Sequence, residues 1–268
     1  MSPSSCQPVV VPAYTAAQIR TAEGPYLEAG VPLMLRAATA LAKVISETVK
    51  SPEVPDDLRI LFLVGSGNNG GDALFAASQL AQGGAHVLAM PVGAKLHKHG
   101  LLEAQASGVR FVHPEELAEL ALDEFPMDVI VDGILGTGTS SNSALRGTGR
   151  EVIQSILEHL DSTVTTVIAV DIPSGLHPVT GNSDEVVLPA DVTVTFGCLK
   201  QGVATEEAKP FVGEIILVDI DIGAELEKLE PVGKGEIARI LDATATNFPK
   251  PLLTFLESGT VPVTFTEN

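Results

Sequence analysis

The sequence predicts an α/β protein built as a Rossmann-like three-layer sandwich, with a mostly parallel sheet and helices on both faces. Strand-like runs alternate with helix-like segments from residue 58 to residue 222, which is the pattern of consecutive βαβ units. The run at 58–65 is almost entirely Leu, Ile, Phe and Val. Such continuous apolarity is expected where helices cover a strand on both sides.

The chain before this alternation is expected to hold a flexible terminus and two helices. Residues 1–13 are rich in Ser and Pro and are expected to be flexible. Apolar residues recur with helical spacing over 15–23 and 31–49, and Pro32 suits the first turn of the second helix. The segment SPEVPDD, at 51–57, is expected to be a linker.

The alternating part supplies the other elements of a main domain that is expected to span 14–223. Its strands are expected at 58–65, 85–93, 109–114, 128–138, 163–175, 191–197 and 213–222. Its helices are expected at 72–84, 95–108, 115–125 and 146–160. From residue 224 the pattern weakens into helical fragments and Pro breaks, so residues 224–268 are expected to form a C-terminal extension of unknown role.

Composition limits the classes of function. The formal net charge is −18, so the mean electrostatic field repels nucleic acids and anionic membranes. The absence of Trp disfavours a surface that stacks on bases. No apolar run reaches membrane-spanning length, and the first residues do not resemble a signal peptide. Cys6 and Cys198 form neither a metal spacing nor a disulfide framework, so a reducing cytoplasm is expected, with no nucleic acid or membrane as partner.

Polar loops follow three of the expected strands. One runs from Gly65 to Asp72, the second begins at Asp132, and the third begins at Asp171. Ligands of open α/β sheets collect beyond the carboxyl ends of the strands, so we expect the three loops to converge on one cleft. Three converging polar loops are more specific evidence for a site than any one of them.

The first loop contains Gly65-Ser-Gly67-Asn-Asn-Gly70, which satisfies the G-x-G-x-x-G pattern of dinucleotide-binding folds. The next strand ends without the acid that holds the ribose in an ordinary NAD dehydrogenase, which argues against that class. Asp72 has two interpretations. It caps the start of the helix, or it joins Asn68 and Asn69 in a set of oxygen ligands for a small cation or a hydroxyl-rich ligand.

The other two loops carry further candidate residues. Asp132 either caps the end of its strand or belongs to the site, and the backbone amides around Gly136 and Gly138 suit a phosphate cradle. Asp171 follows a very apolar strand, so it is expected to be partly desolvated and suited to acid–base chemistry. Ser174 lies in Ile-Pro-Ser-Gly-Leu rather than in G-x-S-x-G, which argues against a hydrolase nucleophile.

With all three loops in place, the chain resembles the NAD(P)H-hydrate epimerases of the YjeF N-terminal domain type. The resemblance covers roughly residues 14–223, and the matching stretches occur in the same order as in the family. It rests on the stretches GSGNNGGDALFAA, VDGILGTG with LRG, VIAVDIPSGLHPVTGN, ADVTVTFGCLKQG and GEIILVDIDI. The Asn-Asn-Gly-Gly-Asp and Asp-Ile-Pro-Ser-Gly motifs are its most specific parts.

The resemblance implies an isomerase that interconverts the R and S forms of hydrated NADH and NADPH, with water added at C6 of the nicotinamide, in nucleotide repair. It implies a potassium ion bound by Asn69, Asp132 and Ser174, and Asp171 as general acid/base at the damaged ring. The implied substrate contacts are Asn68, Asn69, Gly70, Gly71, Asp72, Gly136, Thr137, Gly138, Thr139, Ser140, Ser141, Asn142 and Asp171. A homodimer, and a separate NAD(P)H-hydrate dehydratase as functional partner, are implied as well.

Two positions depart from the family pattern. Ala73 stands where the family usually has Gly, and Leu35 stands where it usually has an acid. These departures keep open an alternative, a non-catalytic nucleotide-binding or scaffold protein on the same fold. The enzyme is favoured by a retained set of side-chain oxygens for which a scaffold has no physical need, those of Asn69, Asp132, Asp171 and Ser174. The register of the second loop after Gly138 stays open, as does the preference between NADH and NADPH hydrates.

Overall fold

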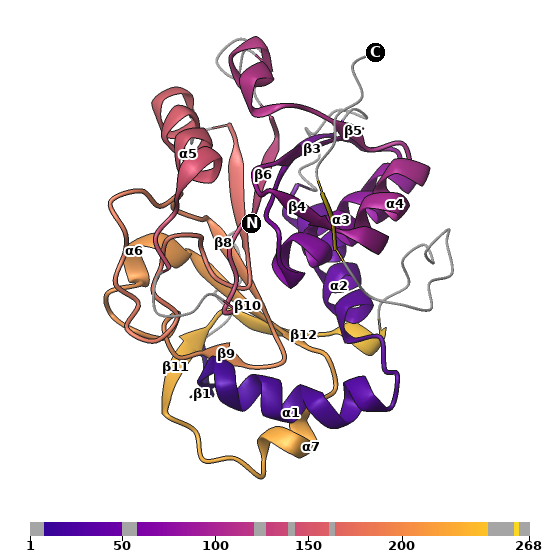
Figure 1. The fold of residues 1–268 in the computed structure, drawn as a ribbon. Helices are drawn as coiled ribbons and strands as arrows, with labels where there is room; N and C mark the ends of the chain where they lie inside the picture. The colour runs from indigo at the N-terminus through magenta and orange to yellow at the C-terminus, as the bar shows by residue number, and fades with distance from the viewer. Residues whose placement is uncertain are drawn as a thin grey trace, which may run out of the picture.

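The computed structural model describes residues 8–49, 58–120, 127–138, 143–160, 164–245 and 260–262, without the side chains of 118–120, 245 and 260–262. Its centre is an eight-stranded, wholly parallel sheet of order β12-β10-β8-β7-β6-β2-β3-β5 (Figure 1). These strands are β2 (Arg59–Val64), β3 (His86–Pro91), β5 (Arg110–Phe111), β6 (Val129–Gly133), β7 (Thr166–Val170), β8 (Val192–Phe196), β10 (Glu214–Asp219) and β12 (Arg239–Asp242).

Helices cover both faces of this sheet, which confirms the predicted three-layer sandwich (Figure 1). One face carries α2 (Leu33–Thr48), α3 (Asn68–Gln82) and α4 (Lys98–Ala106). The other carries α5 (Gly147–His159) and the 3-10 helix η1 (Pro114–Leu120). The remaining helices are α1 (Ala16–Glu28), α6 (Lys209–Val212), α7 (Gly223–Leu226) and the 3-10 helix η2 (Ala243–Ala245).

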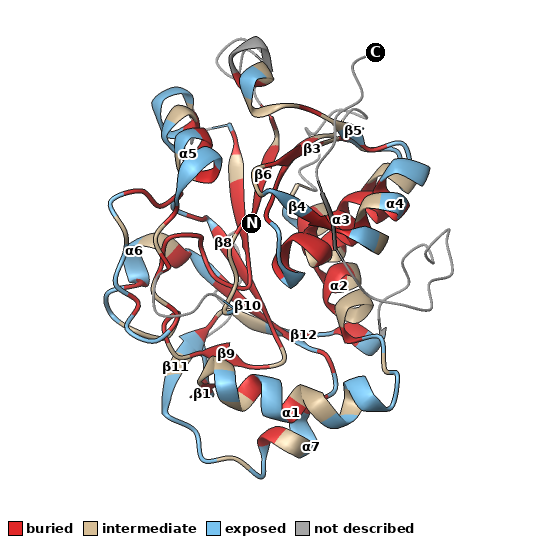
Figure 2. Cartoon of the chain, viewed as in Figure 1, coloured by how far each residue is buried: buried red, intermediate tan, exposed pale blue. Residues whose placement is uncertain are grey.

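The strand β2 shows how the sequence produces these layers. Side chains alternate between the two faces of a strand. Phe62 therefore joins the hydrophobic cluster under α2 and α3, whereas Leu61 and Leu63 join the cluster under α5. All three are fully buried, as a strand covered on both faces requires, and Figure 2 shows the central strands as buried.

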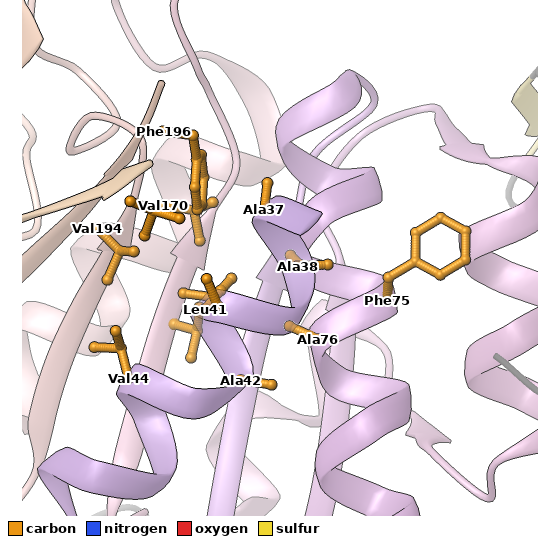
Figure 3. Close-up of a cluster of buried hydrophobic side chains, with 14 of the residues drawn as sticks. Ala37, Ala38, Leu41, Ala42, Val44, Phe75, Ala76, Val170, Val194 and Phe196 are labelled. Carbon is orange, nitrogen blue, oxygen red and sulfur yellow. The ribbon is translucent and has the colours of Figure 1, made fainter. Parts of the chain in front are cut away.

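Alanines allow α2 and α3 to pack closely on the sheet. Ala38 and Ala42 of α2 and Ala76 of α3 are fully buried. Figure 3 shows them beside Leu41, with Val194 of the sheet in the same cluster. Small side chains let helix axes approach. This packing fixes α3, whose first turn carries the Asn-Asn-Gly-Gly-Asp motif.

The expectation that residues 1–13 are flexible is wrong for the part that the structure describes. The strand β1 (Val9–Tyr14) pairs antiparallel with β11 (Gly233–Ile237) and parallel with β9 (Leu199–Lys200) in a second sheet. Its Val-Val-Val run supplies the strand propensity that the flanking prolines obscured. Residues 1–7 lie outside the described residues.

The expected boundary at residue 223 does not separate the two parts of the described chain. After it, α7 packs against α1, β11 pairs with β1, and β12 pairs with β10 at one edge of the main sheet. These strands are short and polar, and their pairing partners are distant in sequence, so periodicity did not reveal them. The described start of the extension is therefore integrated with the main sheet.

Several element boundaries also differ from expectation. α3 begins at Asn68 rather than Asp72, and the expected helix 95–108 starts with the strand β4 (Lys95–His97), which pairs with β13 (Thr260–Pro262). The linker at 51–57 and the end of the helix at 115–125 fall outside the described residues. Within the described parts of the chain, no single helix has the length and apolarity to cross a membrane. Only α1 and α2 together, bent by 112° at their junction, satisfy that test.

Candidate active site

The three polar loops meet at one cavity of about 640 Å³ at the carboxyl ends of the strands. The first and second loops form much of its wall, and Asp171 of the third loop, with Lys200 of β9, also lines it. The remaining wall comes from α1, the start of α2, the segment after β3 (Val92 and Gly93), Phe196 and Ile220. The expected convergence of the loops is therefore present, and α1 is an additional wall that the sequence did not predict.

The glycines of the first loop have different roles. A Cβ atom at Gly65 would lie 1.8 Å from the Ile134 carbonyl oxygen, and one at Gly70 would lie 2.1 Å from the Gly65 carbonyl oxygen. Both glycines are thus required for close backbone packing. Gly67 has open space at its Cβ position and lines the cavity. Gly70 and Gly71, expected to contact substrate, lie behind the wall rather than in it.

Asp72 does not cap the helix. The N-cap of α3 is Gly67, and Asp72 is in the helix, where its half-buried side chain lines the cavity. Burial raises the pKa of Asp72 well above its usual range, and the negative charges of Asp171 and Glu23 raise it further. Of the two interpretations of this residue, the structure supports its place in the site.

Asp132 and Ser174 form a buried hydrogen-bonded pair behind the cavity wall. The Ser174 hydroxyl donates to Asp132 Oδ1 at 2.6 Å, and the Ser174 backbone N–H donates to Oδ2 at 2.7 Å. The backbone of Leu135 connects this pair to Asn69: its N–H donates to Ser174 Oγ at 2.9 Å, and its carbonyl accepts from Asn69 Nδ2 at 3.2 Å. The structure therefore gathers Asn69, Asp132 and Ser174 around one backbone turn.

This cluster fits a hard cation. Its donors are carboxylate, hydroxyl, amide and carbonyl oxygens, which such ions prefer. Burial raises the pKa of Asp132, while hydrogen bonds from Ser174 and Ile134 oppose that rise. No ion pair with a basic side chain is found for Asp132 among the described residues, so a bound cation would offset its charge. The described chain has no group of three or more His, Cys, Asp or Glu that could hold a metal.

Asp171 lies in a strained backbone position next to a buried lysine. Its φ of 69° is in the left-handed region, which is unfavourable for a residue with a side chain. Asp171 Oδ1 lies 2.5 Å from Lys200 Nζ and accepts a hydrogen bond from Thr195 Oγ1 at 3.3 Å. Thr137 Oγ1 of the second loop donates to Oδ2 at 3.4 Å. These contacts fix the carboxylate at the cavity wall.

Lys200 is held in its charged form. Burial alone would lower the pKa of Lys200, but Asp171 raises it through charge and hydrogen bonding, and the net change is upward. The ammonium also donates to the Phe196 carbonyl oxygen at 2.5 Å. Sequence reasoning missed Lys200 because its strand, β9, has only two residues. Its position within the matching stretch ADVTVTFGCLKQG was the available signal.

The other expected site residues divide into two groups. Gly136, Thr137 and Gly138 line the cavity together with Asn68 and Asn69. The expected contacts Thr139, Ser140, Ser141 and Asn142 lie outside the described residues.

The two departures from the family pattern lie away from the cavity wall. Ala73 is fully buried, and a Cβ atom at Gly133 would meet its methyl group at 2.7 Å. That methyl group therefore faces β6. Leu35 is half-buried, and its neighbour Met34 lines the cavity where Leu35 does not. Neither substitution alters the shape of the cavity directly.

Comparisons with known proteins agree with this geometry. The profile of the family described as YjeF-related protein N-terminus matches residues 30–202. The NAD(P)H-hydrate epimerase of Microbacterium testaceum is 39% identical, over 82% of this chain and 83% of its own. The NAD(P)H-hydrate epimerase of Clavibacter sepedonicus is 42% identical, over 82% of this chain and 94% of its own. The solved yeast protein ynu0 (YNL200c) has the same fold, with a TM-score of 0.65 at 16% identity, covering 83% of this chain and 96% of its own.

Some relatives are longer. The bifunctional NAD(P)H-hydrate repair enzyme Nnr of Pyrobaculum aerophilum is 34% identical over 78% of this chain, which spans 41% of that enzyme. The fold, the convergence of the three loops and the sequence identities all indicate the same family. The chain belongs to the NAD(P)H-hydrate epimerase family of YjeF-related N-terminal domains.

Proposed function

We propose that this protein is an NAD(P)H-hydrate epimerase, an isomerase that interconverts the R and S forms of hydrated NADH and NADPH. The observation that carries the proposal is the cavity in which Asp171 and Lys200 form a buried ion pair next to the Asn69–Asp132–Ser174 cluster. Relatives of nearly equal length that bear this name support it. A non-catalytic scaffold has no use for charges buried at a cavity wall, since burying them is unfavourable.

Asp171 is the general acid/base of this proposal. Inversion at C6 requires that the hydroxyl leaves and returns, or that the ring opens and closes, and both routes move a proton at the C6 oxygen. A carboxylate fixed at a cavity wall by an ion pair and by threonine hydroxyls can accept and return that proton. Asp171→Asn is expected to lower turnover about 100-fold or more while the fold is retained. Near-normal turnover in this variant would remove Asp171 from the mechanism.

The two glycine-containing loops are proposed to bind the dinucleotide. The backbone around Gly136 and Gly138 suits the phosphates, and so does the start of α5, where Arg146 and Gly149 line the same cavity. Amides at a helix N-terminus attract anions. The segment from Asn68 to Asp72 would contact the nucleotide, with Asn68, Asn69 and Asp72 in the wall and Gly70 and Gly71 supporting them from behind.

We also propose that potassium is the cation of the Asn69–Asp132–Ser174 cluster. Bound there, it would supply positive charge behind the second loop and fix the backbone turn at Leu135. The oxygens of this chain favour an alkali or alkaline-earth ion over a transition metal. We further propose that the protein acts as a homodimer in the cytoplasm. Its functional partner is a separate NAD(P)H-hydrate dehydratase, and the names of the bifunctional relatives support a coupling of two repair activities.

The decisive experiment measures epimer interconversion directly. The purified protein is mixed with one epimer of hydrated NADH, and the approach to equilibrium is followed by chromatography with potassium, with sodium and without either ion. The spontaneous reaction is subtracted. Acceleration that depends on potassium supports both the enzyme and the cation, and acceleration under all conditions supports the enzyme alone. A rate equal to the blank would favour the scaffold.

A further inference from the structure

The cavity contains a carboxyl group that the three loops do not account for. Glu23, on α1, is half-buried and lines the same cavity as Asp171 and Lys200. Among the described residues, no hydrogen bond or ion pair is found for the Glu23 carboxyl group. Its interactions with Lys200, Asp171 and Arg20 act at longer range. Glu23 is thus a cavity carboxyl group that is not engaged in fixing the structure.

Glu23 reaches the cavity from a different element than Asp171 does. Asp171 is at the end of β7, in the middle of the main sheet. The helix α1 contacts α2 and α7, and its Ile19 and Ala22 join the hydrophobic cluster under α2 and α3 (Figure 1). The third carboxyl group of the cavity, Asp72, comes from α3, the helix of the first loop. The three carboxyl groups therefore enter one cavity from three separate elements.

The electrostatic environments of Glu23 and Asp171 differ. Burial raises the pKa of Glu23 and the negative charge of Asp171 adds to this rise, whereas Lys200 and Arg20 oppose it. Asp171 is in direct contact with the Lys200 ammonium. The environment of Glu23 favours its protonated form, whereas Asp171 is held in an ion pair. Two carboxyl groups in contrasting environments are a recurrent arrangement for acid and base roles in one site.

We propose that Glu23 is a second acid–base group of the epimerisation, acting on the face of the nicotinamide ring opposite to Asp171. The inference rests on the proposed function and deepens it. Inversion of a carbon centre through a planar intermediate needs proton transfer on both faces of that plane, and two carboxyl groups that reach one cavity from separate elements can provide it.

The proposed step balances without a further reagent. The Glu23 carboxyl group gives its proton to the C6 hydroxyl on its own face. The C6–O bond breaks, its electron pair leaves with water, and the N1 lone pair forms a C6=N1 bond. A solvent water then adds to C6 from the other face, its proton passes to the Asp171 carboxylate, and the π electrons return to N1. The reverse reaction exchanges the two roles after both groups equilibrate with solvent.

Isotope exchange tests this assignment. Each epimer is incubated separately in water labelled with heavy oxygen, and both label uptake at C6 and conversion to the other epimer are measured. The variants are Glu23→Gln and Asp171→Asn, with Glu28→Gln as a matched control, because Glu28 is exposed on the same helix and does not line the cavity. Asp72→Asn serves as the comparison for the third carboxyl group.

The expected pattern is complementary. In Glu23→Gln, conversion falls about 100-fold, but one epimer still takes up label with retained configuration, because Asp171 can remove and return the hydroxyl on its face. In Asp171→Asn, only the other epimer does so. Equal loss of exchange for both epimers in Glu23→Gln, or normal conversion, would overturn the inference, as would the complementary pattern in Asp72→Asn. Absence of conversion in the unaltered protein would instead overturn the proposed function.

Discussion

Asp171 and Lys200 illustrate how one contact at the residue scale links stability to activity. Their side chains are 11% and 4% exposed, so the ion pair is largely removed from water. A buried pair gains little over apolar residues of the same size, but removal of one partner leaves a buried charge uncompensated. The pair is therefore better explained by the chemistry of the cavity than by stability.

A double-mutant cycle tests this view of the pair. Lys200→Met is expected to lower the free energy of unfolding by about 3–5 kcal/mol, because Asp171 remains charged and buried. The combination of Lys200→Met with Asp171→Asn is expected to recover more than half of that loss, since no charge is left. Urea denaturation followed by circular dichroism measures both values. Additive losses would show that the two residues are not coupled.

The raised pKa of Asp72 predicts how the stability of the protein depends on pH. Its pKa is raised in the folded protein, so the folded state binds the proton more tightly than the unfolded chain does. The stability that this proton provides is complete below the unfolded pKa, near pH 4, and is lost as the pH rises through the folded pKa.

Asp72→Asn removes this loss, so we expect it to raise Tm at pH 8. The expected increase is about 2–4 °C, the shift that about 1 kcal/mol of additional unfolding free energy produces in a protein of this size. The increase should shrink as the pH falls and vanish below about pH 4, where wild-type Asp72 is protonated in both states. Calorimetry at several pH values measures it. A gain that does not vary with pH would contradict the assignment.

At this scale, sequence motifs located some site residues and missed others. The Asp-Ile-Pro-Ser-Gly and Asp-Gly motifs follow long apolar strands, so the convergence of their loops could be predicted from the strand pattern. The grouping of Ser174 with Asp132 came from the family resemblance. Lys200 is the second residue of a two-residue strand, and Glu23 lies on a helix that is distant in sequence from every motif. Their positions depend on tertiary packing, which periodicity does not report.

At the element scale, the start of α3 depends on backbone contacts. Gly70 lies in the first turn, where a Cβ atom would be 2.1 Å from the Gly65 carbonyl oxygen. Gly70→Ala is therefore expected to destabilise the protein by about 1–3 kcal/mol or more, as overpacking does. Gly67→Ala is the matched variant, because no atom lies within 4 Å of its Cβ position.

Gly67→Ala is expected to change stability by less than about 0.5 kcal/mol, while its methyl group enters the cavity and raises KM. Thermal unfolding and epimerisation kinetics measure the two effects. A similar loss of stability in both variants would show that the contact at Gly70 is not the cause.

The predictability of an element followed its length. The long apolar strands and the helices α2, α3 and α5 were predicted with errors of a few residues, because their periodic patterns extend over several turns or strand positions. Short strands such as β4 and β9 contain too few residues for a pattern. They form because a partner strand, distant in sequence, satisfies their backbone hydrogen bonds.

At the scale of the whole molecule, the chain after residue 223 completes the fold instead of extending it. β12 is the edge strand next to β10, and its first residue, Arg239, pairs with Glu47 of α2 at 2.9 Å. Ile237 of β11 and Leu241 of β12 are buried. Sequence alone could not show this, because β11 reads Gly-Lys-Gly-Glu-Ile and has no apolar alternation.

Truncation distinguishes an integrated segment from a dispensable one. A chain that ends at residue 226 lacks β11 and β12, so it exposes the edge of β10 and loses the burial of Ile237 and Leu241, worth about 1.5–3 kcal/mol each. We expect it to unfold at a Tm lower by about 6–24 °C or to be insoluble, given roughly 2–4 °C for each 1 kcal/mol. A chain that ends at residue 245 keeps both strands and serves as the control. Among the described elements it loses only the three-residue strand β13, so its Tm should stay much closer to that of the full chain. If the two truncated chains are equally stable, the edge strand contributes nothing and the boundary expected at residue 223 is restored.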